Sequence, residues 1–137
     1  MIKFELLVCA ESLIKGDNDT YSAINIFEDY VAEAFPTFIP RMEILLAVSR
    51  VSGDPNSIVT NFLIANNEMT LYSSTPQIQF YDKPKGYLKL SIGSLAIGQP
   101  GFLLFKFTYE QEVIQYKINL KLRDRPSIIS ESGDKKL

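Results

Sequence analysis

Acidic residues stand in four turn-like segments of this sequence, and calcium binding is the chemistry they could support. The four that matter most are Asp17, Asp19, Asp54 and Asp82. If consecutive strands run antiparallel, alternate connections meet at one end of the molecule, and these carboxylates would gather on one rim. Calcium takes about six to eight oxygen ligands. The sequence therefore gives a calcium-dependent binding domain as one hypothesis.

The same rim would carry Asn56, Glu110 and Glu112, but two features oppose a cation site. Asp and Asn favour turns for backbone reasons alone. Lys83 and Lys85 would lie on this rim and repel a cation. An ordinary solvated rim is therefore the alternative interpretation.

The composition excludes several catalytic chemistries. The chain contains no histidine and a single cysteine, Cys9. Histidine-assisted nucleophiles, histidine-ligated metals, thiolate zinc sites and iron–sulfur clusters are therefore excluded. The seven glycines stand singly and form no phosphate-binding loop. We expect no cofactor.

Paired carboxylates are the remaining acid–base option, and they define a carboxylate-based hydrolase as a further alternative. Glu28 and Asp29 would point to opposite faces of a strand, so they would not converge on one bond. Glu110 and Glu112 fall in a hairpin tip, where burial cannot easily tune a pKa. We therefore expect the protein not to be an enzyme.

Cys9 is expected to be a small buried hydrophobe rather than a reactive thiol, because free cysteines are usually buried. Strict alternation places it with Leu7 and Leu13, on the face opposite Phe4, Leu6 and Val8. A lone cysteine makes no internal disulfide, which favours a cytoplasmic location.

Charge and hydropathy give no sign of nucleic-acid or membrane binding. The 137 residues carry a net charge of −2, and the basic residues form no stripe. No apolar run approaches the ~20 residues of a membrane-spanning helix. The apolar content of 46% suits one globular domain, which we assign to residues 1–122, followed by a polar C-terminal tail over residues 123–137.

Alternation of apolar and polar residues predicts an all-β fold of about eight strands. The expected strands cover residues 4–14, 21–30, 42–51, 58–65, 70–81, 87–97, 102–109 and 113–122. Phe35 to Pro40 is expected to be irregular, and Pro76 should interrupt its strand. Amphipathic strands of this kind bury their apolar faces best in an antiparallel two-sheet sandwich.

The expected core takes one face of each of three strands. Its members are Phe4, Leu6, Val8, Leu88, Leu90, Ile92, Ile114, Tyr116, Ile118 and Leu120. Some apolar residues would then face outward: Leu7, Leu45, Leu63 and every second residue of the 102–109 strand. A homodimer could bury this apolar surface, and a covering loop or the C-terminal tail is the alternative.

Short motifs resemble those of an uncharacterised bacterial family of small proteins, a domain of unknown function with an immunoglobulin-like sandwich. They are Asn25-Ile26-Phe27-Glu28, Phe35-Pro36, Pro40 and Pro100-Gly101-Phe102, and the likeness covers residues 2–122. The resemblance implies an immunoglobulin-like fold and no activity. With catalysis disfavoured, the leading functional hypothesis is a noncatalytic binding module that recognises an unknown protein partner.

Overall fold

The computed structural model describes residues 1–124 and consists of eleven strands and one short 3₁₀ turn. The tail predicted over residues 123–137 lies outside the described residues from 125 onward. The elements are β1 (Lys3–Lys15), η1 (Asp17–Asp19), β2 (Tyr21–Ile26), β3 (Asp29–Ala32), β4 (Thr37–Ser49), β5 (Ser57–Val59), β6 (Asn61–Asn66), β7 (Met69–Ser74), β8 (Gln77–Gln79), β9 (Lys85–Ile97), β10 (Gly101–Tyr109) and β11 (Glu112–Leu122).

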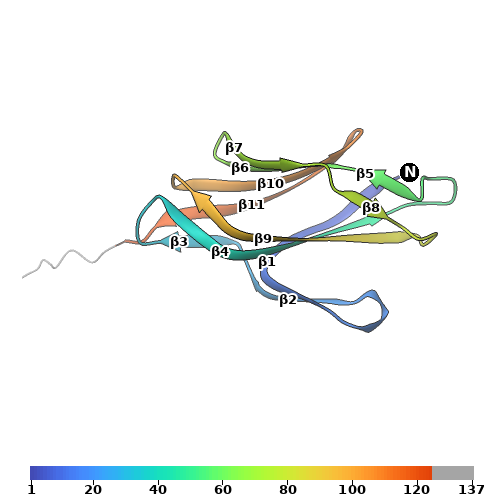
Figure 1. Ribbon diagram of the computed structural model, residues 1–137, viewed down its shortest axis with the longest axis horizontal. Coiled ribbons are helices and arrows are strands. Elements are labelled where there is room, and N and C mark those ends of the chain that lie inside the picture. The colour runs from blue at the N-terminus through green and yellow to red at the C-terminus, as the bar shows by residue number, and fades with distance from the viewer. Residues whose placement is uncertain (125–137) are drawn as a thin grey trace, which may run out of the picture.

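Two principal sheets face each other, which confirms the predicted all-β sandwich (Figure 1). One sheet has the order β2-β1-β4-β9 and the other β3-β11-β10-β6-β7, while β5 and β8 form a small third sheet. The pairing is antiparallel with one exception, since β3 runs parallel to β11. This pair departs from the purely antiparallel expectation because the chain crosses from one sheet to the other between β2 and β3.

The prediction of eight strands was wrong because three expected strands are each divided in two. Residues 21–30 become β2 and β3, which belong to different sheets. Residues 58–65 separate at Thr60 into β5 and β6, and residues 70–81 separate around Pro76, as the proline predicted. The segment expected to be irregular becomes strand from Thr37, and Pro40 lies within β4.

The main core lies between the two principal sheets and confirms the predicted register of β11. Ile118 and Leu120 are buried there, whereas Lys117 and Asn119 are exposed. The other predicted residues of β9 and β11 are partly buried against this core: Leu88, Leu90, Ile92, Ile114 and Tyr116. Among the largest buried side chains are three from β10, namely Leu103, Phe105 and Phe107.

The predicted inward face of β1 was wrong beyond its first residue. Phe4 is buried, but Leu6 is exposed, and Leu7 and Cys9 lie in the core instead. The reason is a break in the register between β1 and β4 that falls between Phe4 and Leu6. One extra residue at such a bulge turns every later side chain to the other face.

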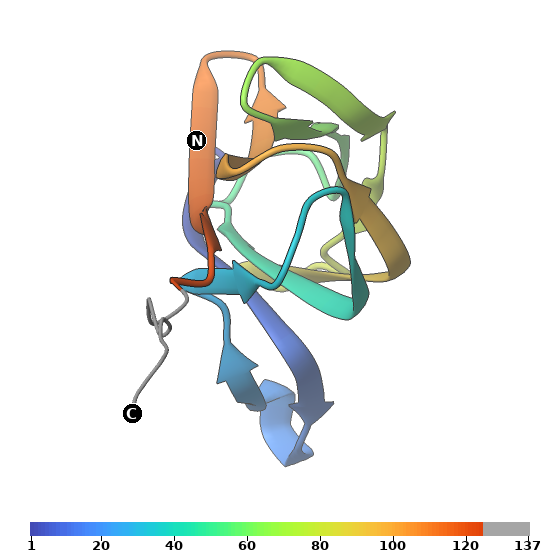
Figure 2. The ribbon, with the colours of Figure 1, turned by 90° about the vertical axis from the view of Figure 1, so that its left-hand side faces the viewer.

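The hairpin of β1 and β2, residues 10–26, extends from the side of the sandwich, and we call it the arm (Figure 2). Up to Ala10, β1 pairs with β4, and from Ala10 to Lys15 it pairs with β2. The second half of β1 therefore leaves β4 and takes β2 as its partner, so that β2 forms the edge of this sheet.

Candidate interaction surface

The structure places the four predicted calcium ligands on three separate connections. Asp17 and Asp19 belong to the turn at the tip of the arm, Asp54 to the β4–β5 loop and Asp82 to the β8–β9 turn. Among residues 1–124, no group of three or more His, Cys, Asp or Glu side chains is placed to hold a metal ion. Calcium binding therefore stays a prediction of the sequence alone.

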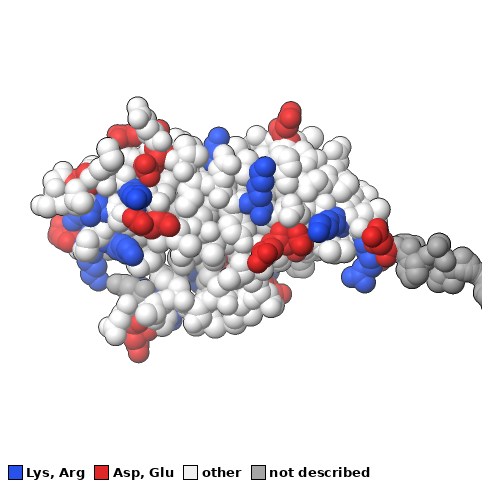
Figure 3. Space-filling model, turned by 180° about the vertical axis from the view of Figure 1, so that it is seen from behind, with Lys and Arg blue, Asp and Glu red and all other residues white. Residues whose placement is uncertain are grey.

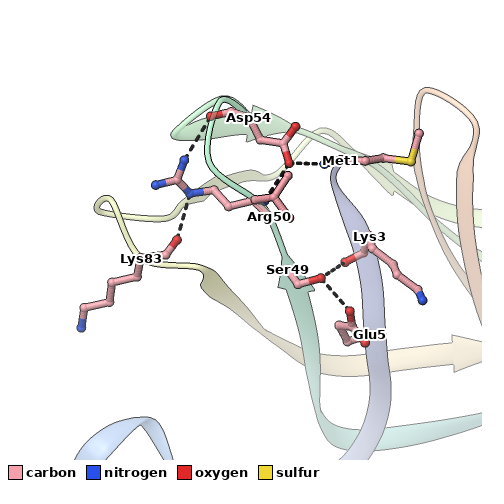
Figure 4. Close-up of polar contacts among 8 residues, drawn as sticks. Met1, Lys3, Glu5, Ser49, Arg50, Asp54 and Lys83 are labelled. Atoms are coloured by element: carbon pink, nitrogen blue, oxygen red, sulfur yellow. Dashed lines mark hydrogen bonds and ion pairs between the residues drawn. The ribbon is translucent and has the colours of Figure 1, made fainter.

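Arg50 ties two of these connections together and occupies the space between them (Figure 4). Its Nε donates to the Lys83 carbonyl at 2.9 Å, and its Nη1 donates to the Asp54 carbonyl at 3.0 Å. The guanidinium also lies over the Phe80 ring, 5.6 Å from its centroid. The Arg50 guanidinium therefore links the β4–β5 loop and the β8–β9 turn at this end of the sandwich.

The carboxylate of Asp54 contacts the Met1 ammonium and a backbone amide of its own loop. It lies 2.6 Å from the Met1 ammonium and accepts a 2.8 Å bond from the Val51 amide. These two donors hold the pKa of Asp54 below its usual value, so the carboxylate is ionised at neutral pH. The Met1 ammonium lies close enough to form an ion pair with it.

One member of each predicted carboxylate pair makes a structural contact. Asp29 accepts a bond from Asn119 and lies 3.6 Å from Lys121. Glu112 accepts a 3.1 Å bond from the Phe4 amide. These carboxylates connect strands of the sandwich, and none of the contacts directs two carboxylates at one point.

Cys9 is a fully buried core residue, and burial raises the pKa of its thiol far above the usual value. The thiol is therefore protonated at neutral pH and surrounded by apolar side chains. Cys9 is therefore the buried small hydrophobe that the sequence predicted. The face was predicted wrongly, because Cys9 shares the core with Phe4.

The outward apolar residues singled out by the sequence are mostly covered. Leu7 faces the core because of the bulge, and Leu63 is partly buried. The outward Phe102 ring lies under Lys117, whose Nζ is 4.6 Å from the ring centroid. Leu45 does face outward, but the arm covers it.

The arm attaches to the sandwich through a small second apolar cluster. Ala10, Leu13 and Leu45 are its buried members. Tyr21 of the arm and Tyr87 of β9 pack against them, with their ring centroids 5.2 Å apart. One face of the arm is thereby held against the outer surface of β4 and β9.

Glu43 of β4 is a buried charged residue at this attachment, about 5% exposed. Its Oε1 accepts a 2.6 Å bond from the Leu13 amide, and its Oε2 accepts a 2.9 Å bond from Ser91. The Leu13 carbonyl accepts a bond from Lys89, whose Nζ lies 3.6 Å from Glu43. Glu43 thus accepts from the Leu13 amide and Lys89 donates to the Leu13 carbonyl, at the point where β1 no longer pairs with β4.

These contacts lower the pKa of Glu43. The bond from the Leu13 amide is the largest cause, and Ser91, Lys89 and Arg41 act in the same direction against the effect of burial. The carboxylate is therefore ionised at neutral pH and bound to the arm.

The opposite face of the arm is exposed and apolar. Ile14, Ile24 and Ile26 are 52%, 44% and 51% exposed. In the register of the arm, Ser12 opposes Ile24 and Ile14 opposes Ser22, so the three isoleucines share one face. Ala10, opposite Ile26, belongs to the same face but is buried at the base of the arm, where β1 still pairs with β4. Sequence reasoning missed this surface because it treated residues 4–14 and 21–30 as ordinary sandwich strands.

Charged side chains elsewhere on the surface are mixed in sign. Figure 3 shows basic and acidic side chains interspersed at the two ends of the face seen from behind. Near the last described residues, Arg123 lies 2.8 Å from Glu33. The visible face thus lacks the single-sign patch expected of a nucleic-acid binder.

Within residues 1–124, no helix is long and apolar enough to cross a membrane. No family model, curated protein or solved structure matches this chain. Membership of the immunoglobulin-like family therefore stays a prediction from the short motifs.

Proposed function

We propose that this protein is a noncatalytic protein-interaction module and that the arm is its binding surface. The observation that carries the proposal is the exposed face of Ile14, Ile24 and Ile26 on a hairpin that stands beside the sandwich. Exposed apolar surface that the fold does not use commonly marks an interaction site. The proposed setting is cytoplasmic, because a chain with one buried cysteine makes no disulfide of its own.

The edge position of β2 supports the same proposal. β2 is the last strand of its sheet, so one row of its backbone groups faces outward. An open strand edge can accept a further strand, which is a recurring way of binding proteins. The arm thus offers both backbone donors and acceptors and an apolar face.

Photo-crosslinking in cells that make the protein tests this function. A photoreactive residue at Ser22 on the arm should give discrete adducts with protein, whereas one at Gln115, which is exposed on β11, should not. Mass analysis of the adducts identifies what is bound. The proposal fails if the arm position gives no discrete adduct or no more than the Gln115 position.

A further inference from the structure

We infer that the occupant of the arm is a second copy of this chain, paired antiparallel through β2 across a twofold axis near the middle of that strand. This inference rests on the proposed function, since it names the partner of the same surface. The two sheets would join into one continuous sheet of eight strands.

The first argument is charge. The six residues of β2, Tyr-Ser-Ala-Ile-Asn-Ile, include no ionisable group other than the tyrosine hydroxyl. A twofold antiparallel pair places each residue opposite one from the same short segment. Any charged residue near the axis would therefore face a like charge, which destabilises a strand pair. β2 avoids that repulsion along its whole length.

The second argument is the comparison with the other edges of the two principal sheets. β3 carries Asp29, and β9 carries Lys85 and Lys89. Charges on an edge strand oppose pairing with a further strand. β2 carries no such protection.

β7 is the other uncharged edge strand, and it differs from β2 in two ways. Its register with β6 breaks between Ile64 and Ala65, and such a bulge twists an edge away from a flat partner. Its Tyr72 ring contacts Phe62 edge-on at 6.1 Å, within its own sheet. β2 pairs with β1 without a shift of register, and its one left-handed residue, Asn25 (φ 56°), lies near its end, so the regular stretch is residues 21–24.

The third argument is the exposed face. In the paired arrangement the isoleucines of both copies would lie on the same face of the joined sheet, because opposed residues of an antiparallel pair share a face. Ile24 of each copy would then lie beside Ser22 or Ile24 of the other, depending on the residue at the axis. Apolar contact across the axis would add to the backbone hydrogen bonds.

Sedimentation of the full chain tests the inference. At tens of micromolar we expect a dimer, and Ile24→Lys or Ser22→Lys should shift it to a folded monomer. The melting temperature of each variant should match that of the native chain at concentrations too low for dimerisation. Lysine at these exposed positions places like charges close together at the axis. Tyr72→Lys is the matched control, since Tyr72 is 48% exposed on the other uncharged edge, and it should leave the dimer intact.

A cysteine pair gives a second measurement that does not depend on the lysine variants. Ile24→Cys should give a covalent dimer with a short cysteine-to-cysteine crosslinker, whereas Tyr72→Cys should not. Cys9 is buried and should not react with the crosslinker, so the native chain serves as the control for background crosslinking.

A monomer at all concentrations would overturn the inference, as would a dimer that Tyr72→Lys but not Ile24→Lys dissociates. Neither result would by itself refute the interaction module. That proposal fails only if the arm also gives no discrete adduct in cells.

Discussion

At the scale of single residues, Glu43 is the charge on which the attachment of the arm depends. Its carboxylate accepts from the Leu13 amide, and removing its charge weakens this bond and the attraction to Lys89 and Arg41. We expect Glu43→Gln to lower the free energy of unfolding by about 1–2 kcal/mol at neutral pH. Urea melts measure this, and Glu5→Gln, at an exposed carboxylate, should change stability by less than about 0.5 kcal/mol.

The pH dependence of this difference has a defined sign. The folded pKa of Glu43 lies below its ordinary value of 4.5, so folding favours the ionised form. The stabilisation is therefore complete above that value and is lost as the pH falls through the lower, folded pKa. The difference in free energy of unfolding between the native protein and Glu43→Gln should be constant near neutrality. It should shrink as the pH falls below 4.5. A difference unchanged in acid would contradict this role.

Ile118 tests the register of β11 at the same scale. Its side chain is fully buried, whereas Gln115 of the same strand is exposed. Burying an unpaired carboxylate is costly, so Ile118→Asp should destabilise the fold by about 3–5 kcal/mol or prevent folding. Gln115→Asp should leave the melting temperature nearly unchanged. Similar melting of the two variants would contradict the assigned register.

At the scale of elements, Arg50 joins the β4–β5 loop to the β8–β9 turn through two carbonyls. Lysine cannot reproduce the planar guanidinium that reaches both at once. Arg50→Lys should therefore speed amide exchange at Arg50 and Lys83, whose amides bond to Pro84 and Phe80. Arg123→Lys, at an exposed ion pair, is the control and should leave this exchange unchanged. Equal exchange in both variants would refute the role of Arg50.

The elements that alternation predicted well are those with one face in the core and one in water. β11 and the inward part of β9 are examples, because period-two alternation determines which face is buried. Alternation could not reveal the bulge after Phe4, which reverses the faces of Leu6 and Leu7. That reversal depends on pairing with β4, a strand more than thirty residues away.

The candidate surface was missed for a related reason. In the arm, Asn25 separates Ile24 from Ile26 just as polar residues separate core residues, so this sequence pattern matches that of a sandwich strand. Their exposure follows from β1 leaving β4 after Ala10, and the bond from Leu13 to Glu43 accompanies that departure. Only the tertiary arrangement distinguishes the two cases.

At the scale of the whole molecule, the two apolar clusters are unequal, and we expect two cooperative units. The main core contains large side chains from both sheets, whereas the cluster under the arm has three buried members, Ala10, Leu13 and Leu45. Local opening is cheapest where few apolar contacts must be broken. The arm should therefore open at a lower free energy than the sandwich.

Native-state hydrogen exchange measures both openings, on the Ser22→Lys variant, which we expect to be monomeric. Amides of β2 should exchange with a smaller opening free energy than those of β4 and β10. Glu43→Gln should lower the protection of the arm, since it weakens the bond to Leu13. Amides of β10 should still have a larger opening free energy than those of the arm in this variant, because Glu43 lies on the outer surface of the other sheet. If β2 and β10 exchange with the same opening free energy, the arm and the sandwich unfold as one unit, and the arm is then part of the core structure rather than an appended surface.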